Sequence, residues 1–281
     1  MDLIYEMKKE MFRRKYSART IKAYVFCVQK FIKWFPNEFK RATKDDVKRY
    51  LQHLCEKDMS ASTLNLYLQS IKFALEEVIG KPKFWVNLPY SKVEKALPEV
   101  LSKEEVVRIF SAIHNKKHWL LVKLMYSAGL RVSETVHLKV KDLELRRNFG
   151  WVRKGKGNKD RLFIIARKLN PELKEWIDME NLKLNSWLFS GRNSHLTARS
   201  VQEMIKKAIK TANIQRNIHP HTLRHSFATH LIENGYSVAD VQLLMGHNSP
   251  NTTMMYVHMA SPRMINVESP YDELPPENRK V

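Results

Sequence analysis

The sequence predicts a mainly α-helical protein: an N-terminal four-helix bundle, then a C-terminal α+β domain with a small three-stranded antiparallel sheet. Apolar residues recur at helical spacing through the first eighty residues, interrupted by short polar breaks. Residues 82–98 contain three prolines and no clear period, which is typical of a linker. Within the helical second half, residues 143–165 contain short strand-like runs.

Four helices are expected in residues 1–81, and the apolar stripe of the second is the clearest. That stripe consists of Ile21, Tyr24, Val25, Val28, Phe31 and Ile32. The first two helices are expected at residues 3–14 and 18–35. The third should start within Thr43–Asp46 and end near Lys57, and the fourth should start within Ser60–Ser62 and end at Gly80. Around one apolar centre, four short helices make a small bundle.

Residues 99–261 are expected to form the second domain. Ser102 and Glu105 form a capping box that opens its first helix. A loop from Lys154 to Asp160 has the glycine and asparagine content of a hairpin turn, and its glycines lack the spacing of a nucleotide-binding loop. The expected strands are 143–145, 151–153 and 161–165.

The chain is strongly basic, with a formal net charge of +20 and a pI of about 9.9. Both halves of the chain share the excess of positive charge, which favours a polyanionic partner that is bound through its phosphates. A merely solvated lysine-rich surface is the alternative. We find no apolar run of transmembrane length, no signal peptide and no aromatic RNA-binding motif, so membrane or RNA binding is disfavoured.

Cys27 and Cys55 are the two cysteines, both in helical patterns. We expect them to be reduced, small and buried apolar residues of an intracellular protein. A disulfide between them is the alternative.

Reactive side chains follow one another through the second half: Arg131, a lysine-rich loop from Arg153 to Arg161, and then His221, Arg224, His247 and Tyr256. This set suits cleavage of a phosphodiester without a metal. Guanidinium groups neutralise the charge on the non-bridging oxygens of a phosphoryl transition state. A tyrosine hydroxyl can act as the nucleophile and form a covalent intermediate.

The ordered set resembles the tyrosine recombinase (phage integrase) family, within it the Xer site-specific recombinases, and most closely the single-protein archaeal kind. The best signal is the run from His221 to His230 (HTLRHSFATH), followed by Leu-Met-Gly-His247 and a tyrosine nine residues later. The resemblance covers about residues 5–260. It implies a SAM-like core-binding domain that lies over one face of DNA, and a catalytic domain after it.

Several roles can be expected for the site. Arg131 lies just before an expected N-cap, Ser133, so its side chain can extend from a helix start toward a phosphate. An ordinary ion pair with Glu134 is the alternative, and Glu134 itself is expected to orient an arginine. Arg224 follows His221 by one helical turn, so both can face one site.

Proton transfer and attack are assigned to the remaining members of the set. His221 is the expected general base toward the Tyr256 hydroxyl, and His247 the expected hydrogen-bond donor to a non-bridging oxygen. A tyrosine packed at a helix end is the alternative for Tyr256 alone. The resemblance favours Lys156 over its loop neighbours as the general acid for the leaving oxygen.

The other histidines of the cluster, His219, His225 and His230, are expected to be packing residues. A metal site is the alternative, but no cysteine pair or acidic partner completes a ligand set. No metal and no other cofactor is expected.

Phosphate contacts outside the catalytic set are named from charge and helix position alone, and a solvated surface charge is the alternative for each. The candidates are Arg14, Arg19, Lys22, Lys48, Lys72 and Lys159.

The resemblance implies strand exchange on double-stranded DNA by a tetramer, through a 3′-phosphotyrosyl intermediate and without ATP. We expect a cytoplasmic, nucleoid-associated enzyme that resolves chromosome dimers at a dif-like site, with no small-molecule substrate and no membrane partner. A phage or plasmid integrase, a type IB topoisomerase and a non-catalytic DNA-binding relative are the alternatives. The slightly acidic tail, residues 262–281, is expected to dock on a neighbouring protomer or to be a frayed end.

Overall fold

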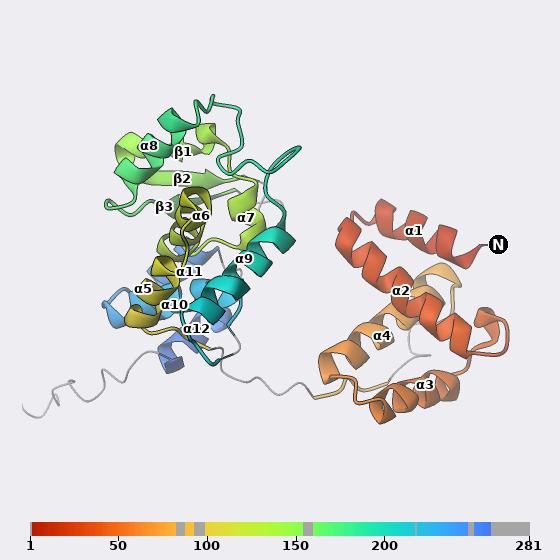
Figure 1. Ribbon diagram of the computed structural model, residues 1–281. Helices are drawn as coiled ribbons and strands as arrows, with labels where there is room; N and C mark the ends of the chain where they lie inside the picture. Colours follow the sequence, from red (N-terminus) through yellow and green to blue (C-terminus); the bar gives the residue numbers. More distant parts are fainter. Residues whose placement is uncertain are drawn as a thin grey trace, which may run out of the picture. The chain divides into compact units, whose positions relative to one another are not determined.

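The computed structural model describes residues 2–82, 88–92, 99–153, 160–216, 218–246 and 250–259. In the last range it describes the side chains of 252–254, 256 and 257. The chain divides into two compact units, Met1–Ala96 and Leu97–Val281, both drawn in Figure 1. The division falls inside the segment expected to be a linker, and the tail 262–281 lies outside the described residues.

The N-terminal unit contains the four helices that the apolar spacing predicts. They are α1 (Leu3–Arg13), α2 (Ala18–Trp34), α3 (Lys44–Glu56) and α4 (Ala61–Phe73), with a 3₁₀ turn, η1 (Phe39–Arg41), and a π-helical turn, η2 (Ala74–Val78), after α4. Side-chain caps fix the starts: the hydroxyl of Ser17 accepts from the N–H of Thr20, and Thr43 forms a capping box with Asp46.

Aromatic side chains fill the centre of this unit. Phe31 is fully buried, stacks on Phe35 at a centroid distance of 5.5 Å and meets the ring of Tyr50 edge-on at 5.0 Å. Ile32, expected on the apolar stripe, lies at its edge and is 37% exposed, because the stripe of α2 follows Val28 and Phe31.

The two cysteines differ from each other. Cys27 is buried as expected, whereas Cys55 is exposed, so the expectation of two buried cysteines is wrong for the second. Cys55 belongs to the last turn of α3, where the inward positions are taken by Tyr50 and Leu54. Both thiols are free, which settles the question of a disulfide between them.

The C-terminal unit is mostly helical and carries a sheet at one end (Figure 1). Its α-helices are α5 (Lys103–Ser111), α6 (Lys116–Ser127), α7 (Val132–Val136), α8 (Asn170–Met179), α9 (Ala198–Thr211), α10 (Pro220–Glu233), α11 (Val238–Met245) and α12 (Pro250–Met259). The strands β1 (Leu143–Glu144), β2 (Phe149–Val152) and β3 (Arg161–Ile164) form an antiparallel sheet in that order, flanked by the 3₁₀ turns η4 (Val140–Asp142) and η5 (Leu145–Arg147). The three-stranded sheet is confirmed.

Several bounds differ from the prediction by one or two residues, and the shift of one strand has a clear local reason. Strand β2 begins at Phe149 and not at Trp151, because Asn148 takes a left-handed conformation (φ 56°) and turns the chain directly into the strand. Helix α10 begins at Pro220, since proline suits the first helical turn and His219 is its N-cap.

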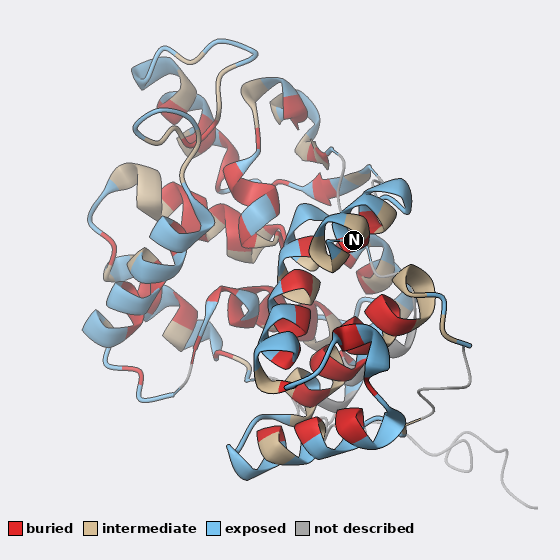
Figure 2. Cartoon of the chain, turned by 90° about the vertical axis from the view of Figure 1, so that its right-hand side faces the viewer, coloured by how far each residue is buried: buried red, intermediate tan, exposed pale blue. Residues whose placement is uncertain are grey.

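Helix α10 is the central element of the second unit and packs against α6, α11 and α12. Its inward residues Leu223, Phe227 and Leu231 are buried, as the sequence predicts. Figure 2 shows buried residues in red along the inner faces of the helices of each unit. In the ranges that the structure describes, no helix is both long and apolar enough to cross a membrane.

Two phenylalanines of α2 allow a matched stability test of the N-terminal core. Phe31→Ala should destabilise the N-terminal unit by about 3–5 kcal/mol, because it opens a cavity among packed rings. Phe26→Ala should change the stability by less than ~0.5 kcal/mol, since Phe26 is 52% exposed on the same helix. Hydrogen exchange of α2 and α3 peptides in the full-length chain measures both effects, and equal protection in the two variants would contradict this account of the core.

Candidate active site

The expected catalytic residues come from separate elements of the C-terminal unit. Arg131 precedes α7, Arg224 and His221 belong to α10, and Tyr256 belongs to α12. Two members of the set, Lys156 and His247, lie outside the described residues, as does the candidate DNA contact Lys159. Of the others, Arg131 and Arg224 converge on one buried carboxylate, that of Glu134.

Arg131 is itself the N-cap of α7, so the expectation that Ser133 caps this helix is wrong. The reason is the carboxylate of Glu134, which reaches back to the N–H of Arg131 (2.8 Å) and fixes the helix start at Val132. The same carboxylate accepts from Nη1 of Arg131 at 2.6 Å. The hydrogen bonds to Glu134 therefore restrain Arg131, and 22% of its side chain is still exposed to solvent.

Glu134 joins three arginines. Besides Arg131, its Oε2 accepts from Nη2 of Arg161 at 2.6 Å and lies 3.9 Å from Nη1 of Arg224. Burial would raise the pKa of Glu134, but the charges of these arginines and the backbone N–H of Arg131 lower it below the usual range. Glu134 thus stays a carboxylate and orients the arginines around it.

Arg224 is almost fully buried and donates to the carbonyl oxygens of Gly129 and Met245. Burial, assisted by the charge of Arg131, lowers the pKa of Arg224 to about 9, so the guanidinium remains charged at neutral pH. Carbonyls from two separate segments therefore hold this cation in one orientation.

Tyr256 lies in the core of this region, 1% exposed, among Phe227, Leu231 and Met245. Burial raises the pKa of its phenol, while the charges of Arg224 and Arg131 lower it. These charges connect the phenol electrostatically to the arginine cluster. The structure thus brings the expected nucleophile and both expected phosphate-binding arginines into one site.

The histidine that contacts Tyr256 is His225, whose Nδ1 lies 3.1 Å from the Tyr256 hydroxyl. Burial lowers the pKa of His225 to about 4, so its ring is neutral at pH 7 and can accept the phenolic hydrogen bond. We expected His221 at this hydroxyl and a packing role for His225. His221 is instead exposed at the start of α10, where desolvation and the charges of Arg224 and Arg131 lower its pKa.

His230 is buried, as expected, and its Nδ1 forms a 2.8 Å hydrogen bond with the hydroxyl of Tyr126. His219 is instead exposed at the N-cap position of α10, so a packing role is wrong for it. Within the described ranges, no group of three or more His, Cys, Asp or Glu side chains could hold a metal ion.

Sequence reasoning missed Arg161 and His225. Signals for both were present, since Arg161 ends the lysine-rich loop and His225 directly follows Arg224 in the motif. Neither signal distinguishes a buried partner of the site from a surface or packing residue, which requires knowledge of the contacts across the fold.

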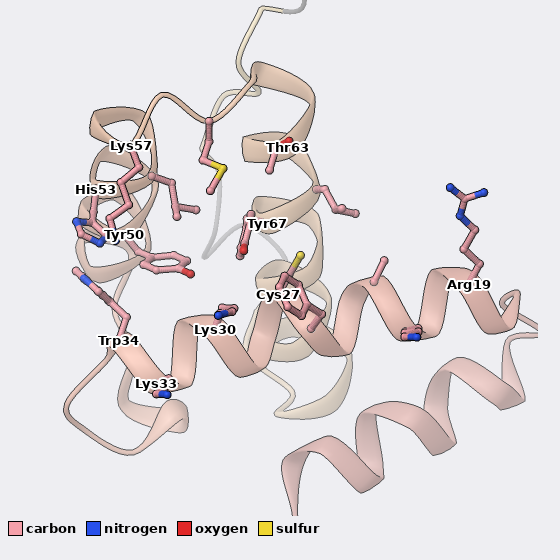
Figure 3. A pocket seen from close by; sticks show the side chains of 16 residues that line it. Arg19, Cys27, Lys30, Lys33, Trp34, Tyr50, His53, Lys57, Thr63 and Tyr67 are labelled. Atoms are coloured by element: carbon pink, nitrogen blue, oxygen red, sulfur yellow. The ribbon is translucent and has the colours of Figure 1, made fainter. Parts of the chain in front are cut away.

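The N-terminal unit contains a groove of about 830 Å³ lined by α2, α3 and α4, shown in Figure 3. We call it the α2–α4 groove. Its floor is apolar, with Phe26, Trp34 and Tyr67. The cations that line it are Arg19, Lys22, Lys30, Lys33 and Lys57. A lining that combines apolar side chains with five cations fits a polyanion that also offers apolar surface, such as DNA.

Some candidate DNA contacts of this unit line the groove or are exposed, whereas others already form ion pairs within the protein. Arg19 and Lys22 lie on the α2–α4 groove, whereas Lys48 is exposed on α3 outside its lining. Arg14 forms ion pairs with Glu10 (2.6 Å) and Glu77, and Lys72 lies 3.9 Å from Glu76. Intramolecular carboxylates thus already neutralise these last two candidates.

The chain matches two family models that together span most of its length. Residues 3–83 match the N-terminal SAM-like domain of phage integrases, and residues 99–263 match the phage integrase family. A tyrosine recombinase of Thermosipho africanus is 32% identical over 274 residues, covering 92% of this chain and 96% of the relative. Tyrosine recombinase XerA of Pyrococcus horikoshii is 34% identical over 252 residues, with 87% and 85% covered.

A solved structure agrees with these sequence matches. The site-specific recombinase XerH, in a post-cleavage complex with a palindromic difH substrate, has a TM-score of 0.73 and 25% identity, covering 92% of this chain and 82% of that chain. The chain therefore belongs to the phage integrase family of tyrosine recombinases, enzymes that break and rejoin DNA.

Proposed function

We propose that this protein is a site-specific recombinase of the Xer type that resolves chromosome dimers at a dif-like site on the nucleoid. The observation that carries the proposal is the placement of the Tyr256 hydroxyl beside a neutral histidine and near two buried or half-buried arginines. The names of the relatives support the biological role, since XerA proteins are similar over most of the chain and XerH was solved with difH.

In the proposed cleavage step, the Tyr256 oxygen attacks the scissile phosphorus and the 5′-oxygen leaves. A 3′-phosphotyrosyl bond forms as the P–O5′ bond breaks, so the bond energy is conserved for the reverse reaction. Arg131 and Arg224 neutralise the non-bridging oxygens. A 5′-hydroxyl of a second duplex then attacks the phosphotyrosyl bond, which restores Tyr256 and exchanges the strands.

His225 is the group best placed to take the phenolic proton, since it is neutral and 3.1 Å from the oxygen. His221, one turn earlier on α10 and close to the charge of Arg224, then joins the arginines around the phosphate. Because Tyr256 is 1% exposed, α12 has to move before the phosphate can reach the hydroxyl. DNA binding is the natural trigger for that movement.

Lys156 is the proposed acid that protonates the leaving 5′-oxygen, and His247 the proposed donor to a non-bridging oxygen. The loop of Lys156 joins β2 to β3, and the pair Arg153–Asp160 (2.8 Å) closes its base.

The α2–α4 groove is the proposed DNA-binding face of the N-terminal unit. It adds Lys30, Lys33 and Lys57 to the candidates Arg19 and Lys22. We further propose a tetramer on DNA, in which residues 262–281 of one protomer dock on the next. A phage or plasmid integrase would perform the same chemistry on other sites.

A type IB topoisomerase is the enzyme of a different class that needs testing. A supercoiled plasmid with two direct copies of a candidate dif-like site separates the two functions. Deletion circles indicate a recombinase, whereas relaxed circles without deletion indicate a topoisomerase. The compact four-helix unit and its relatives favour the recombinase.

The first prediction for this mechanism concerns Tyr256. Tyr256→Phe should abolish the covalent protein–DNA adduct on a nicked substrate and keep DNA binding, because only the nucleophilic oxygen is removed. Denaturing gels measure the adduct and mobility shifts measure the binding. Tyr236→Phe, an exposed tyrosine of the same unit, is the matched control and should form the adduct at the wild-type rate. An adduct with the Tyr256→Phe variant would rule out this nucleophile.

The buried neutral histidine predicts a pH-dependent stability. An unfolded histidine binds a proton below a pKa near ~6.5, whereas folded His225 resists protonation down to about pH 4. Stability contributed by this depressed pKa is complete above pH ~6.5 and is lost as the pH falls toward 4. His225→Gln should therefore reduce the drop in melting temperature between pH 7.5 and 5.5 by about 2–4 °C. His114→Gln, at an exposed histidine, is the control, and an equal reduction in both variants would contradict the buried neutral state.

The proposed acid has a specific chemical test. Lys156→Ala should cleave normal DNA at least ~100-fold more slowly, because a general acid contributes roughly 10²–10⁴-fold. The variant should approach the wild-type rate when sulfur replaces the leaving 5′-oxygen, since a thiolate leaves without a proton. Lys159→Ala is the control from the same loop. Rescue of Lys159→Ala in place of Lys156→Ala would transfer the role to Lys159.

A further inference from the structure

We propose that Arg161 is a positioning residue that sets the place of the phosphate-binding Arg131 through Glu134. The inference deepens the proposed function and rests on it. Arg161 is the first residue of β3 and the side chain that links the hairpin to α7 and to the end of α11.

The first contact of Arg161 connects it to Arg131 through Glu134. Nη2 of Arg161 donates to Oε2 of Glu134 at 2.6 Å, while Oε1 of Glu134 accepts from Nη1 of Arg131 at the same distance. One carboxylate thus stands between two guanidinium groups. Since Glu134 is 6% and Arg161 11% exposed in the side chain, solvent screens this pair poorly. The orientation of Arg131 therefore depends on where Arg161 holds Glu134.

The second contact leads to α11. Nη1 of Arg161 donates to the carbonyl oxygen of Leu244 at 2.8 Å, in the last turn of that helix. Gly246 caps the helix with a left-handed φ of 60°, and a Cβ at this position would lie 2.6 Å from Cδ of Arg161. The glycine leaves room for the arginine stem to pass. His247 follows directly in the sequence, so Arg161 fixes the helix end from which the proposed phosphate donor emerges.

The third connection is through the backbone. Arg161 pairs with Val152 across the sheet, at the end of the hairpin that carries Lys156. Its side chain therefore joins three segments that carry proposed catalytic residues. A guanidinium suits this task because its diverging N–H groups reach a carboxylate and a carbonyl at once, whereas a lysine ammonium is a single point of charge.

Arg161 acts through other residues and does not bind the phosphate itself. Its guanidinium is enclosed, and both Nη atoms are already engaged by Glu134 and Leu244. Burial lowers the pKa of Arg161, and Glu134 opposes that shift. A small displacement of a catalytic group costs on the order of 10²-fold in rate.

The test is single-turnover cleavage of a nicked duplex at saturating protein. Arg161→Ala should cleave about 100-fold more slowly than wild type. Arg161→Lys should recover part of the rate. Arg167→Ala, at an exposed arginine six residues further, is the matched control and should cleave within about 3-fold of wild type.

A neutral substrate distinguishes positioning from misfolding. A methylphosphonate at the scissile position lacks the charge that Arg131 neutralises, so the Arg161→Ala deficit should shrink at least ~10-fold on it, as should the deficit of Arg131→Ala. In the Arg131→Ala background, adding Arg161→Ala should cost less than about 3-fold, because the two residues act in one chain of contacts. A variant that is only misfolded would lose equal activity on both substrates.

The results distinguish an error in the proposed function from an error in the positioning role of Arg161. If wild-type protein forms no phosphotyrosyl adduct, the proposed function is wrong. If wild type cleaves but Arg161→Ala matches it, or its deficit is the same on both substrates, the positioning role is wrong. Should Arg161→Ala melt below the assay temperature, the same comparison is made with Arg161→Lys, which retains the charge, and an undiminished deficit on methylphosphonate overturns the inference.

Discussion

The buried carboxylate of Glu134 is the interaction on which the site depends. Three arginines from α7, β3 and α10 surround it, and without a shared counter-charge they would repel one another in a region that is poorly screened. Glu134 also starts α7 by accepting the N–H of Arg131. One side chain thus sets a helix start and gathers the arginines proposed to bind the phosphate, which couples local folding to the proposed chemistry of the site.

Burial has opposite effects on the two partners of the proposed proton transfer. It raises the pKa of the Tyr256 phenol and lowers that of the His225 imidazole. Both groups are therefore neutral at pH 7, with the hydroxyl held but not ionised. Such a resting state protects a nucleophile from premature reaction, and the charges of Arg131 and Arg224 favour ionisation once a phosphate and the proton acceptor are aligned.

The two units contribute different kinds of binding. The N-terminal unit presents a groove lined by both cations and aromatic side chains, and the proposed DNA-binding role spreads the phosphate contacts over many residues with little dependence on any one. The catalytic unit instead gathers three arginines around one carboxylate, and it holds two of them, Arg224 and Arg161, with hydrogen bonds to the carbonyl oxygens of Gly129, Met245 and Leu244. A basic excess distributed over the whole chain is consistent with both tasks.

The sequence by itself determined the fold class and the family, and it named the candidate catalytic residues. Helical periodicity, capping boxes and the spacing around Arg224 are local properties that need no tertiary information. It could not determine which histidine meets Tyr256, because His221 and His225 differ by one helical turn and only the packing of α12 on α10 selects between them. It also could not separate Arg161 from its exposed basic neighbours, or show that Arg14 is neutralised by Glu77. Those facts depend on contacts between residues far apart in the chain, which the tertiary structure alone decides.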